Sequence, residues 1–154
     1  MMTLCKRVLN ALAGKSLVTA ESCTGGLIGS LLTAVPGSSS VYKGGVICYT
    51  NWVKENILSV PGYVLQQYGA VSCQTAQALA VGVLDKLQAD IAVSVTGLAG
   101  PDGDGSDHPV GIVYIGYADK NTSLARKYVF SGNREQVRYA AAQEALNIIL
   151  EMHH

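Results

Sequence analysis

Hydrophobic residues recur along the chain with two spacings, which predict alternating helices and strands. Helical spacing predicts a first helix capped by Thr3 and ending at Gly14, a second over residues 25–35, and a third capped by Ser72. Short apolar runs predict strands over residues 16–20, 46–49, 90–95, 110–117 and 128–130. Loops separate them, the longest over residues 97–109.

The last helix carries the most specific local signal. Asn133 with Gln136 three residues later matches a capping box, and an apolar stripe follows. Helices alternating with strands, then two adjacent strands, indicate a layered α/β domain with a mixed sheet. Because no repeat, charge block or linker interrupts residues 1–154, we expect a single domain.

Composition narrows the classes of function. Lys+Arg and Asp+Glu are both 11, so no basic excess suggests nucleic-acid binding. No apolar run approaches the roughly 20 residues that span a bilayer, and the N-terminus lacks the pattern of a secretory signal. The four cysteines form no CxxC pair, which argues against structural zinc and against a disulfide framework. We therefore expect a cytoplasmic protein that binds neither membranes nor metal.

Candidate chemistry is concentrated where the first predicted strand runs into a Glu-Ser-Cys-Thr-Gly-Gly turn. Ser22 lies at the start of this turn, as a nucleophile would. The backbone N–H groups around Thr24, Gly25 and Gly26, at a helix N-terminus, would favour an anion or a developing oxyanion. The alternative is that Ser22 or Thr24 only caps the helix and that the glycines only permit the turn.

The partner of Ser22 has to be found among few candidates. Cys23 is a rival nucleophile, but an active thiol needs a neighbouring histidine or another cation. The only histidines are His108, in an Asp-rich loop, and His153 and His154 at the chain end. A histidine-based triad is therefore not expected, and a lysine is the natural base.

Residues 49–54 offer such a lysine. Tyr49, Asn51 and Lys54 would bring a phenol, an amide and an ammonium group to one rim. With Ser22 they form a set that can perform acyl transfer, in which either Lys54 or Tyr49 moves the proton. Lysine has a pKa of roughly 10.4 in water, so Lys54 must be buried to act as a base. The alternative is a solvated Lys54 on a short helix.

Two further segments are weaker candidates. Asp102 and Asp104 begin a calcium-like spacing, but Asp107 and Val113 stand where a calcium loop needs glycine and glutamate, so no calcium site is expected. Arg134 opens the last helix and would bind a phosphate there, unless it is an ordinary surface arginine.

The order of the motifs is more specific than each motif alone. They are Thr19-Ala-Glu-Ser-Cys-Thr-Gly-Gly26, Val35-Pro-Gly-Ser-Ser39, Gly44-Gly45, Tyr49-Thr-Asn-x-x-Lys54, Gly69-Ala-Val-Ser72, Thr96-Gly-x-Ala-Gly-Pro101, Pro109-Val-Gly111 and Phe130-x-Gly-x-Arg134. Together they resemble the CinA C-terminal domain family, in particular its stand-alone nicotinamide-nucleotide amidases (PncC type). The resemblance covers almost the whole chain.

This resemblance implies a three-layer α/β/α domain that hydrolyses the carboxamide of nicotinamide mononucleotide to nicotinate mononucleotide and ammonia, in pyridine-nucleotide salvage. It implies no metal or organic cofactor, and a homo-oligomer, a dimer or larger. Its catalytic positions correspond to Ser22, Tyr49 and Lys54. Those lining the site correspond to Glu21, Thr96 and Arg134.

Two details complete this hypothesis. Arg134 or the loop containing Ser38 and Ser39 would hold the 5′-phosphate. Trp52-Val53, His108 and Asp104 depart from the family's usual residues. Because these departures fall on the rim of the site, the alternative function is a diverged, non-catalytic paralogue that binds a nucleotide or a protein.

Overall fold

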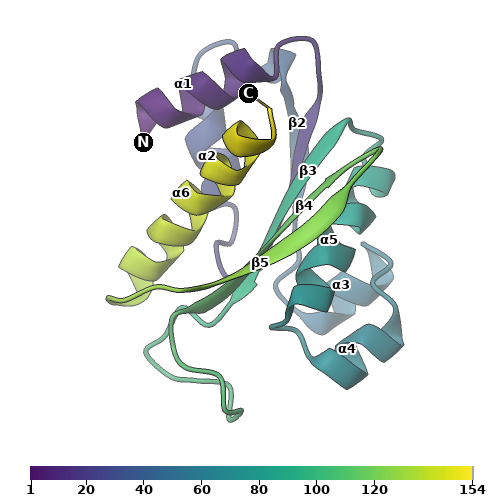
Figure 1. The fold of residues 1–154 in the computed structure, drawn as a ribbon, viewed down its shortest axis with the longest axis vertical. Coiled ribbons are helices and arrows are strands. Elements are labelled where there is room, and N and C mark those ends of the chain that lie inside the picture. Colours follow the sequence, from purple (N-terminus) through teal and green to yellow (C-terminus); the bar gives the residue numbers. More distant parts are fainter. Residues whose placement is uncertain (154) are drawn as a thin grey trace.

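A five-stranded mixed sheet forms the centre of the computed structural model, which describes residues 1–153 (Figure 1). The strand order is β2-β1-β3-β4-β5. The strands are β1 (Leu17–Glu21), β2 (Tyr42–Ile47), β3 (Ile91–Gly97), β4 (Ile112–Asp119) and β5 (Ser123–Val129). β1 runs parallel to β2 and β3, whereas β4 is antiparallel to both β3 and β5. The predicted mixed sheet is confirmed.

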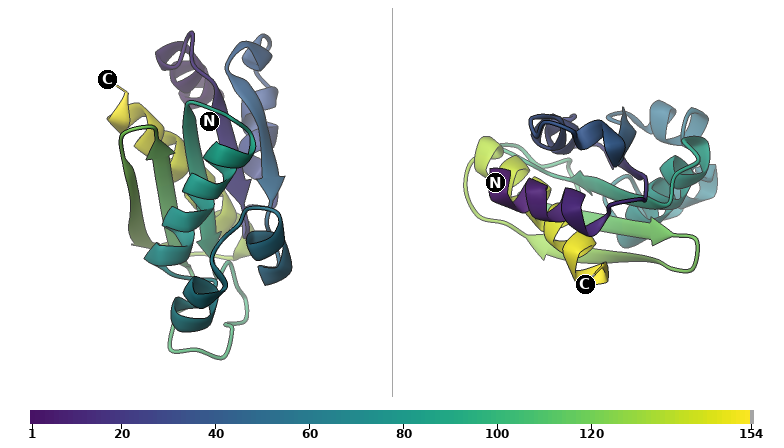
Figure 2. Two further views of the ribbon diagram at one scale, coloured as in Figure 1. Left: turned by 90° about the vertical axis from the view of Figure 1, so that its right-hand side faces the viewer. Right: turned by 90° about the horizontal axis from the view of Figure 1, so that it is seen from above.

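Helices cover both faces of the sheet, so the domain has three layers (Figures 1 and 2). One face carries α1 (Met2–Ala11), α2 (Leu27–Thr33) and α6 (Arg134–Met152). The other carries α3 (Asn51–Asn56), α4 (Gly62–Tyr68) and α5 (Cys73–Lys86). A 3-10 turn, η1 (Ser38–Ser40), precedes β2.

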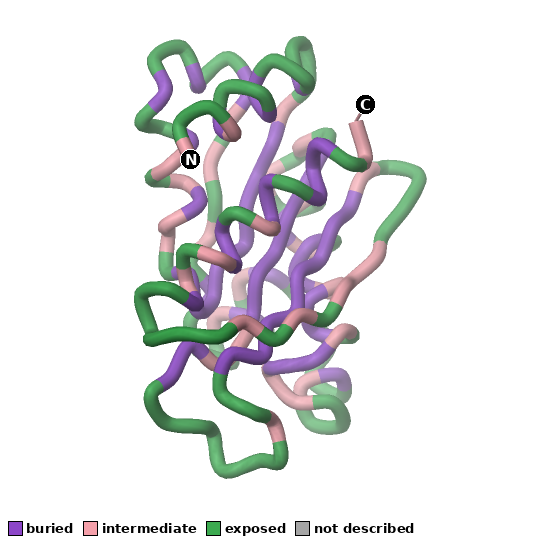
Figure 3. The backbone as a smooth tube through the Cα atoms, turned by 60° about the vertical axis from the view of Figure 1, so that its left-hand side comes forward, coloured by how far each residue is buried: buried purple, intermediate pink, exposed green. Residues whose placement is uncertain are grey.

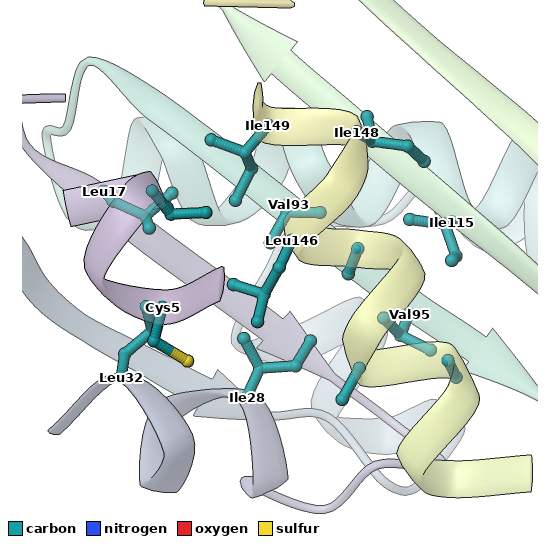
Figure 4. Close-up of a cluster of buried hydrophobic side chains, with 14 of the residues drawn as sticks. Cys5, Leu17, Ile28, Leu32, Val93, Val95, Ile115, Leu146, Ile148 and Ile149 are labelled. Atoms are coloured by element: carbon teal, nitrogen blue, oxygen red, sulfur yellow. The ribbon is translucent and has the colours of Figure 1, made fainter. Parts of the chain in front are cut away.

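The central strands are buried on both faces, as expected for strands between two helical layers (Figure 3). Side chains of successive strand residues point to opposite faces. Leu17 on β1 therefore packs with Val93 and Leu146 under α1 and α6 (Figure 4), whereas Val18 and Ala20 pack beneath α5. This alternation decides which residues near Ser22 meet which helices.

The helix caps with local sequence signals are confirmed. The Ser72 hydroxyl accepts a hydrogen bond from the amide of Thr75 at 3.1 Å. Asn133 and Gln136 form the predicted capping box at the start of α6. The cap at Thr3 is wrong: α1 already begins at Met2, and no side chain caps it.

Other element boundaries also differ from the prediction. β2 begins at Tyr42, four residues earlier than expected, because Gly44-Gly45 hides the alternation of this edge strand. β5 begins at Ser123 rather than at residue 128. Both are edge strands with half-exposed faces, which carry little apolar signal. Within residues 1–153, no helix combines the length and the apolar character needed to cross a membrane.

Candidate active site

The candidate site lies at the carboxyl ends of the three parallel strands. Ser22 follows β1, Cys48 and Tyr49 follow β2, and Thr96 lies near the end of β3. Ligands of open α/β sheets bind at this edge. The edge holds a pocket of about 290 Å³, lined by Ser22, Cys23, Tyr49, Asn51, Lys54, Ala70, Val71, Thr96, Gly97, Leu98, Ala99, Gly100, Asp102, Asp104 and Arg134.

Ser22 and Lys54 form a buried hydrogen-bonded pair. The Lys54 ammonium donates to Ser22 Oγ at 3.0 Å and to the Cys48 carbonyl at 2.5 Å, and the lysine is 1% exposed. The Ser22 amide donates to the carbonyl of Val95 at 2.9 Å, which continues the β1–β3 ladder by one residue. Both partners of the pair are therefore fixed by backbone contacts as well as by each other.

The charge on Lys54 is poorly compensated. Within residues 1–153, no carboxylate lies within 4.0 Å of its ammonium group. Burial disfavours the charged form, which lowers the pKa of Lys54 below its ordinary value. In its neutral form the amine lies 3.0 Å from the Ser22 hydroxyl, close enough to accept its proton. Lys54 does lie on a short helix, as the alternative interpretation held, but it is buried rather than solvated.

Glu21 lies outside this pocket. Its carboxylate accepts hydrogen bonds from the amides of Ile28 at 2.8 Å and Gly29 at 3.1 Å, at the N-terminus of α2. The anion at this helix N-terminus is therefore a side chain of the protein, not a ligand. The amides of Ile28 and Gly29 are therefore not free to bind a substrate or an oxyanion.

The glycine turn is more closed than expected. Gly25 and Gly26 have φ of +58° and +101°, the left-handed region that the turn requires. The Gly25 amide donates to the Ser22 carbonyl at 3.1 Å, and Thr24 is fully buried. Neither Thr24, Gly25 nor Gly26 lines the pocket; the residue of the turn that does so beside Ser22 is Cys23.

Tyr49 and Arg134 meet at the rim. Arg134 Nη2 donates to the Tyr49 hydroxyl at 3.2 Å, and Nη1 donates to the Gly100 carbonyl at 2.7 Å. Arg134 thus joins the rim at Tyr49 to the segment between β3 and β4, which projects beyond the sheet in Figure 1. Thr96 lies deeper, and its hydroxyl donates to the Ala70 carbonyl at 2.7 Å. Asn51 completes the predicted residues that the fold brings to the pocket.

Ser38 and Ser39 do not reach this pocket. They precede β2, whereas the pocket follows its last residue, Ile47. Six strand residues at about 3.3 Å each place roughly 20 Å between the two ends of β2. Within one chain, these serines cannot hold a phosphate in the pocket beside Ser22.

Cys23 is a poor nucleophile in this environment. Burial raises the pKa of its thiol to about 12, despite the nearby cations. The thiol therefore stays protonated at neutral pH, whereas nucleophilic attack needs the thiolate. The Lys54 amine is bonded to Ser22 Oγ and the Cys48 carbonyl, not to this thiol, so Ser22 is the better-placed nucleophile.

Arg138 is a site residue that sequence reasoning missed. It reaches the turn from α6, donating from Nε to the Cys23 carbonyl at 3.0 Å and from Nη2 to the Thr24 carbonyl at 2.8 Å. Its position four residues after Arg134 places both arginines on one face of α6. That spacing was the available signal.

Two other features of the described residues bear on function. A larger groove of about 640 Å³ lies between α4 and α5, but no buried titratable side chain lines it. Residues 1–153 contain no group of three or more His, Cys, Asp or Glu side chains placed to hold a metal ion. The buried Ser22–Lys54 pair is therefore the strongest chemical feature of the described chain.

Comparison with known proteins gives a consistent family match. The family model of the CinA C-terminal domain matches residues 2–153. A CinA-like protein of Desulfotalea psychrophila is 46% identical over 136 residues, covering 88% of this chain and 33% of the relative. A CinA-like protein of a Synechococcus species is 50% identical over 137 residues, 87% of this chain and 32% of the relative. The chain thus spans about a third of the length of these curated relatives.

Solved structures match along the whole chain. The competence/damage inducible protein CihA of Agrobacterium tumefaciens is 37% identical with a TM-score of 0.95, covering 99% of this chain and 95% of that one. A competence or damage-inducible protein of Enterobacter asburiae is 31% identical with a TM-score of 0.96, covering 99% and 98%.

Proposed function

The chain belongs to the CinA C-terminal domain family, and on this premise we propose that it is an amidohydrolase converting nicotinamide mononucleotide to nicotinate mononucleotide and ammonia. The observation that carries the proposal is the buried pair of Ser22 and Lys54, with 3.0 Å between Oγ and Nζ. A serine paired with a lysine of lowered pKa is an activated nucleophile, as acyl transfer from an amide requires.

The first half of the reaction forms an ester. The neutral Lys54 amine takes the proton of Ser22, and Oγ attacks the carboxamide carbon to form a C–O bond. The tetrahedral intermediate collapses when the Lys54 ammonium returns that proton to the amide nitrogen. The C–N bond breaks, ammonia leaves, and the nicotinoyl group remains on Ser22 as an ester.

The second half restores the enzyme. Lys54, again neutral, takes a proton from water, whose oxygen attacks the ester carbon. The bond to Ser22 Oγ breaks, and Lys54 returns the proton to the serine. Nicotinate mononucleotide leaves, so the balance is one water consumed and one ammonia released. No step needs a redox partner or metal.

An oxyanion forms in both halves and needs hydrogen-bond donors. The Gly25 amide is already bonded to the Ser22 carbonyl. The amide of Cys23 belongs to a pocket residue and donates to no backbone oxygen within residues 1–153. We therefore assign the oxyanion to Cys23, the residue directly after the nucleophile.

Residues at the rim of the pocket would bind the part of the nucleotide that does not react. Arg134 uses two of its five N–H donors on protein atoms, which leaves donors for the 5′-phosphate. Tyr49 and Asn51 line the same pocket as this arginine and Ser22. Tyr49 is 58% exposed, and ordering of its ring by bound nucleotide would assist proton transfer at the leaving nitrogen.

The proposal extends to the setting of the enzyme. Four free cysteines suit a reducing compartment such as the cytoplasm. We also expect a homo-oligomer, a dimer or larger, which light scattering of the purified protein tests directly.

The decisive experiment measures ammonia and nicotinate mononucleotide released from nicotinamide mononucleotide. Ser22→Ala should lower turnover by about 10⁴-fold or more, since both halves of the reaction use its oxygen. Ser30→Ala changes an exposed serine on α2 that does not line the pocket; it is the matched control and should keep wild-type turnover. Wild-type protein that is thermally stabilised by the nucleotide but releases no product would instead be the non-catalytic paralogue.

A further inference from the structure

We infer that Arg138 is a positioning residue of the proposed reaction, which holds the nucleophile turn in its working shape from the face of the sheet opposite Lys54. This inference rests on the proposed function. It starts from a side chain that does not itself line the pocket but donates to two consecutive carbonyl groups of the turn, those of Cys23 and Thr24.

The contacts of Arg138 are specific to this turn. Within residues 1–153, no carboxylate forms an ion pair with it, so the two carbonyls are its identified partners. A guanidinium presents its N–H donors in a rigid planar fork, which matches two oxygens side by side. The Cβ that Gly25 lacks would lie 3.6 Å from Arg138 Nη2, so the arginine lies directly along the turn.

Because peptide groups are planar, the two bonds of Arg138 also orient the neighbouring peptide groups of the turn. In a trans peptide, the carbonyl of one residue and the N–H of the next point in opposite directions. Holding the Thr24 carbonyl toward α6 therefore turns the Gly25 N–H away from α6. That N–H donates to the Ser22 carbonyl at 3.1 Å. The orientation of the Ser22 carbonyl in turn fixes the N–H of Cys23, the proposed oxyanion donor, in the opposite direction.

The same helix thus serves the site in two ways. Arg134 holds the rim through Tyr49 and Gly100, while Arg138, one turn later, holds the turn itself. Only Arg134 lines the pocket, so only Arg134 is placed to touch substrate. Loss of Arg138 should therefore slow turnover with little change in substrate binding.

The test compares Arg138→Met with wild type for kcat and KM on nicotinamide mononucleotide. We expect kcat to fall by about 10²–10³-fold, as for loss of an oxyanion donor, with KM within about threefold of wild type. Arg138→Lys keeps the positive charge and the aliphatic part of the side chain but lacks the planar guanidinium, so its kcat should lie between those of wild type and Arg138→Met. Arg126→Met is the matched control. Arg126 lies on β5 and forms an exposed ion pair with Glu151 of α6, so its loss should leave kcat unchanged.

A second readout separates this inference from the choice of substrate. A fluorophosphonate probe labels an activated serine whatever its natural substrate, and the labelled residue is identified by mass spectrometry. If wild type is labelled at Ser22 but does not hydrolyse the nucleotide, the proposed substrate fails, and Arg138 is judged by slower labelling of its variants. Labelling rates and kcat of Arg138→Met and Arg138→Lys within about threefold of wild type overturn the inference, as does a loss confined to KM. Absence of labelling at Ser22 in wild type overturns both proposals.

Discussion

Replacing Lys54 by methionine tests the proposed base most directly. Methionine has a similar length but cannot accept a proton, so Ser22 loses the group that lies 3.0 Å from its hydroxyl. General bases contribute about 10²–10⁴-fold to rate, equivalent to roughly 3–5 kcal/mol of activation free energy. We therefore expect kcat/KM for ammonia release to fall by at least about 10²-fold.

The fold should survive this substitution. Methionine leaves the Cys48 carbonyl without its donor, which costs about 1–3 kcal/mol. The substitution also removes a buried ammonium that has no carboxylate partner among the described residues, which is stabilising. Because these effects oppose each other, the net change should be smaller than a typical stability of about 5–15 kcal/mol. Thermal unfolding of each variant checks that loss of activity is not loss of fold.

The pH dependence gives the same hypothesis a second measurement. Only the neutral Lys54 amine acts as base, so wild-type kcat/KM should rise with pH and level off below the ordinary lysine pKa of 10.5. Stability should also rise with pH between the lowered pKa of Lys54 and that value, because the unfolded chain binds the additional proton there. Lys54→Met should lose both dependences.

Lys43 provides the control variant for Lys54→Met. Lys43→Met removes an exposed lysine whose ammonium donates to the Gln88 carbonyl at 3.0 Å, outside the pocket, and should behave as wild type. If Lys54→Met keeps activity within about tenfold of wild type, or if it keeps the pH dependence of the wild type, Lys54 is not the base.

Three further predictions concern the surroundings of the site. Glu21→Gln removes the charge that caps α2 and should lower the free energy of unfolding, measured by urea denaturation, by about 1–2 kcal/mol. An unchanged free energy would show that the carboxylate interacts only weakly with the two amides. Gly82→Ala would place a Cβ 2.1 Å from the backbone oxygen of Leu58, so it should lower stability by about 1–3 kcal/mol and displace the segment after α3, with loss of activity; an unchanged melting temperature would contradict this contact. Ser72→Ala removes the cap bonded to the Thr75 amide and should cost about 1 kcal/mol in the same assay while leaving turnover unaffected.

Sequence reasoning succeeded where the deciding interactions are local. The Ser72 cap and the Asn133 capping box each join residues three positions apart, so both partners can be identified from the sequence alone. It failed for β2 because Gly44-Gly45 gives an edge strand no apolar alternation to detect. The helix α4 was also missed, since only Val64 of its residues is buried and its helical stripe is correspondingly short.

The site shows the same division. Ser22 and Lys54 were paired by eliminating histidines, and the fold places them at hydrogen-bond distance. Ser38 and Ser39 were misplaced because their location depends on strand direction: a loop before a parallel strand lies at the opposite edge from a residue after one. Arg138 was missed because its spacing from Arg134 indicates only a shared helix face, whereas its partners are backbone carbonyls, which no residue type identifies.

The neighbouring residues Glu21 and Ser22 show why the strand register matters for this chemistry. A carboxylate beside Lys54 would favour its charged form and raise its pKa, and the base would be lost at neutral pH. Glu21 is buried and adjacent in sequence to the nucleophile, yet strand alternation turns it to the face of α2, where its oxygens bind the amides of Ile28 and Gly29. Ser22 faces the layer of α3 and meets Lys54 there. A one-residue shift of β1 would exchange the positions of these two side chains and bring the Glu21 carboxylate next to the Lys54 amine. The β1–β3 register, which the Ser22 amide extends to Val95, is therefore a condition for a neutral Lys54 as well as for folding.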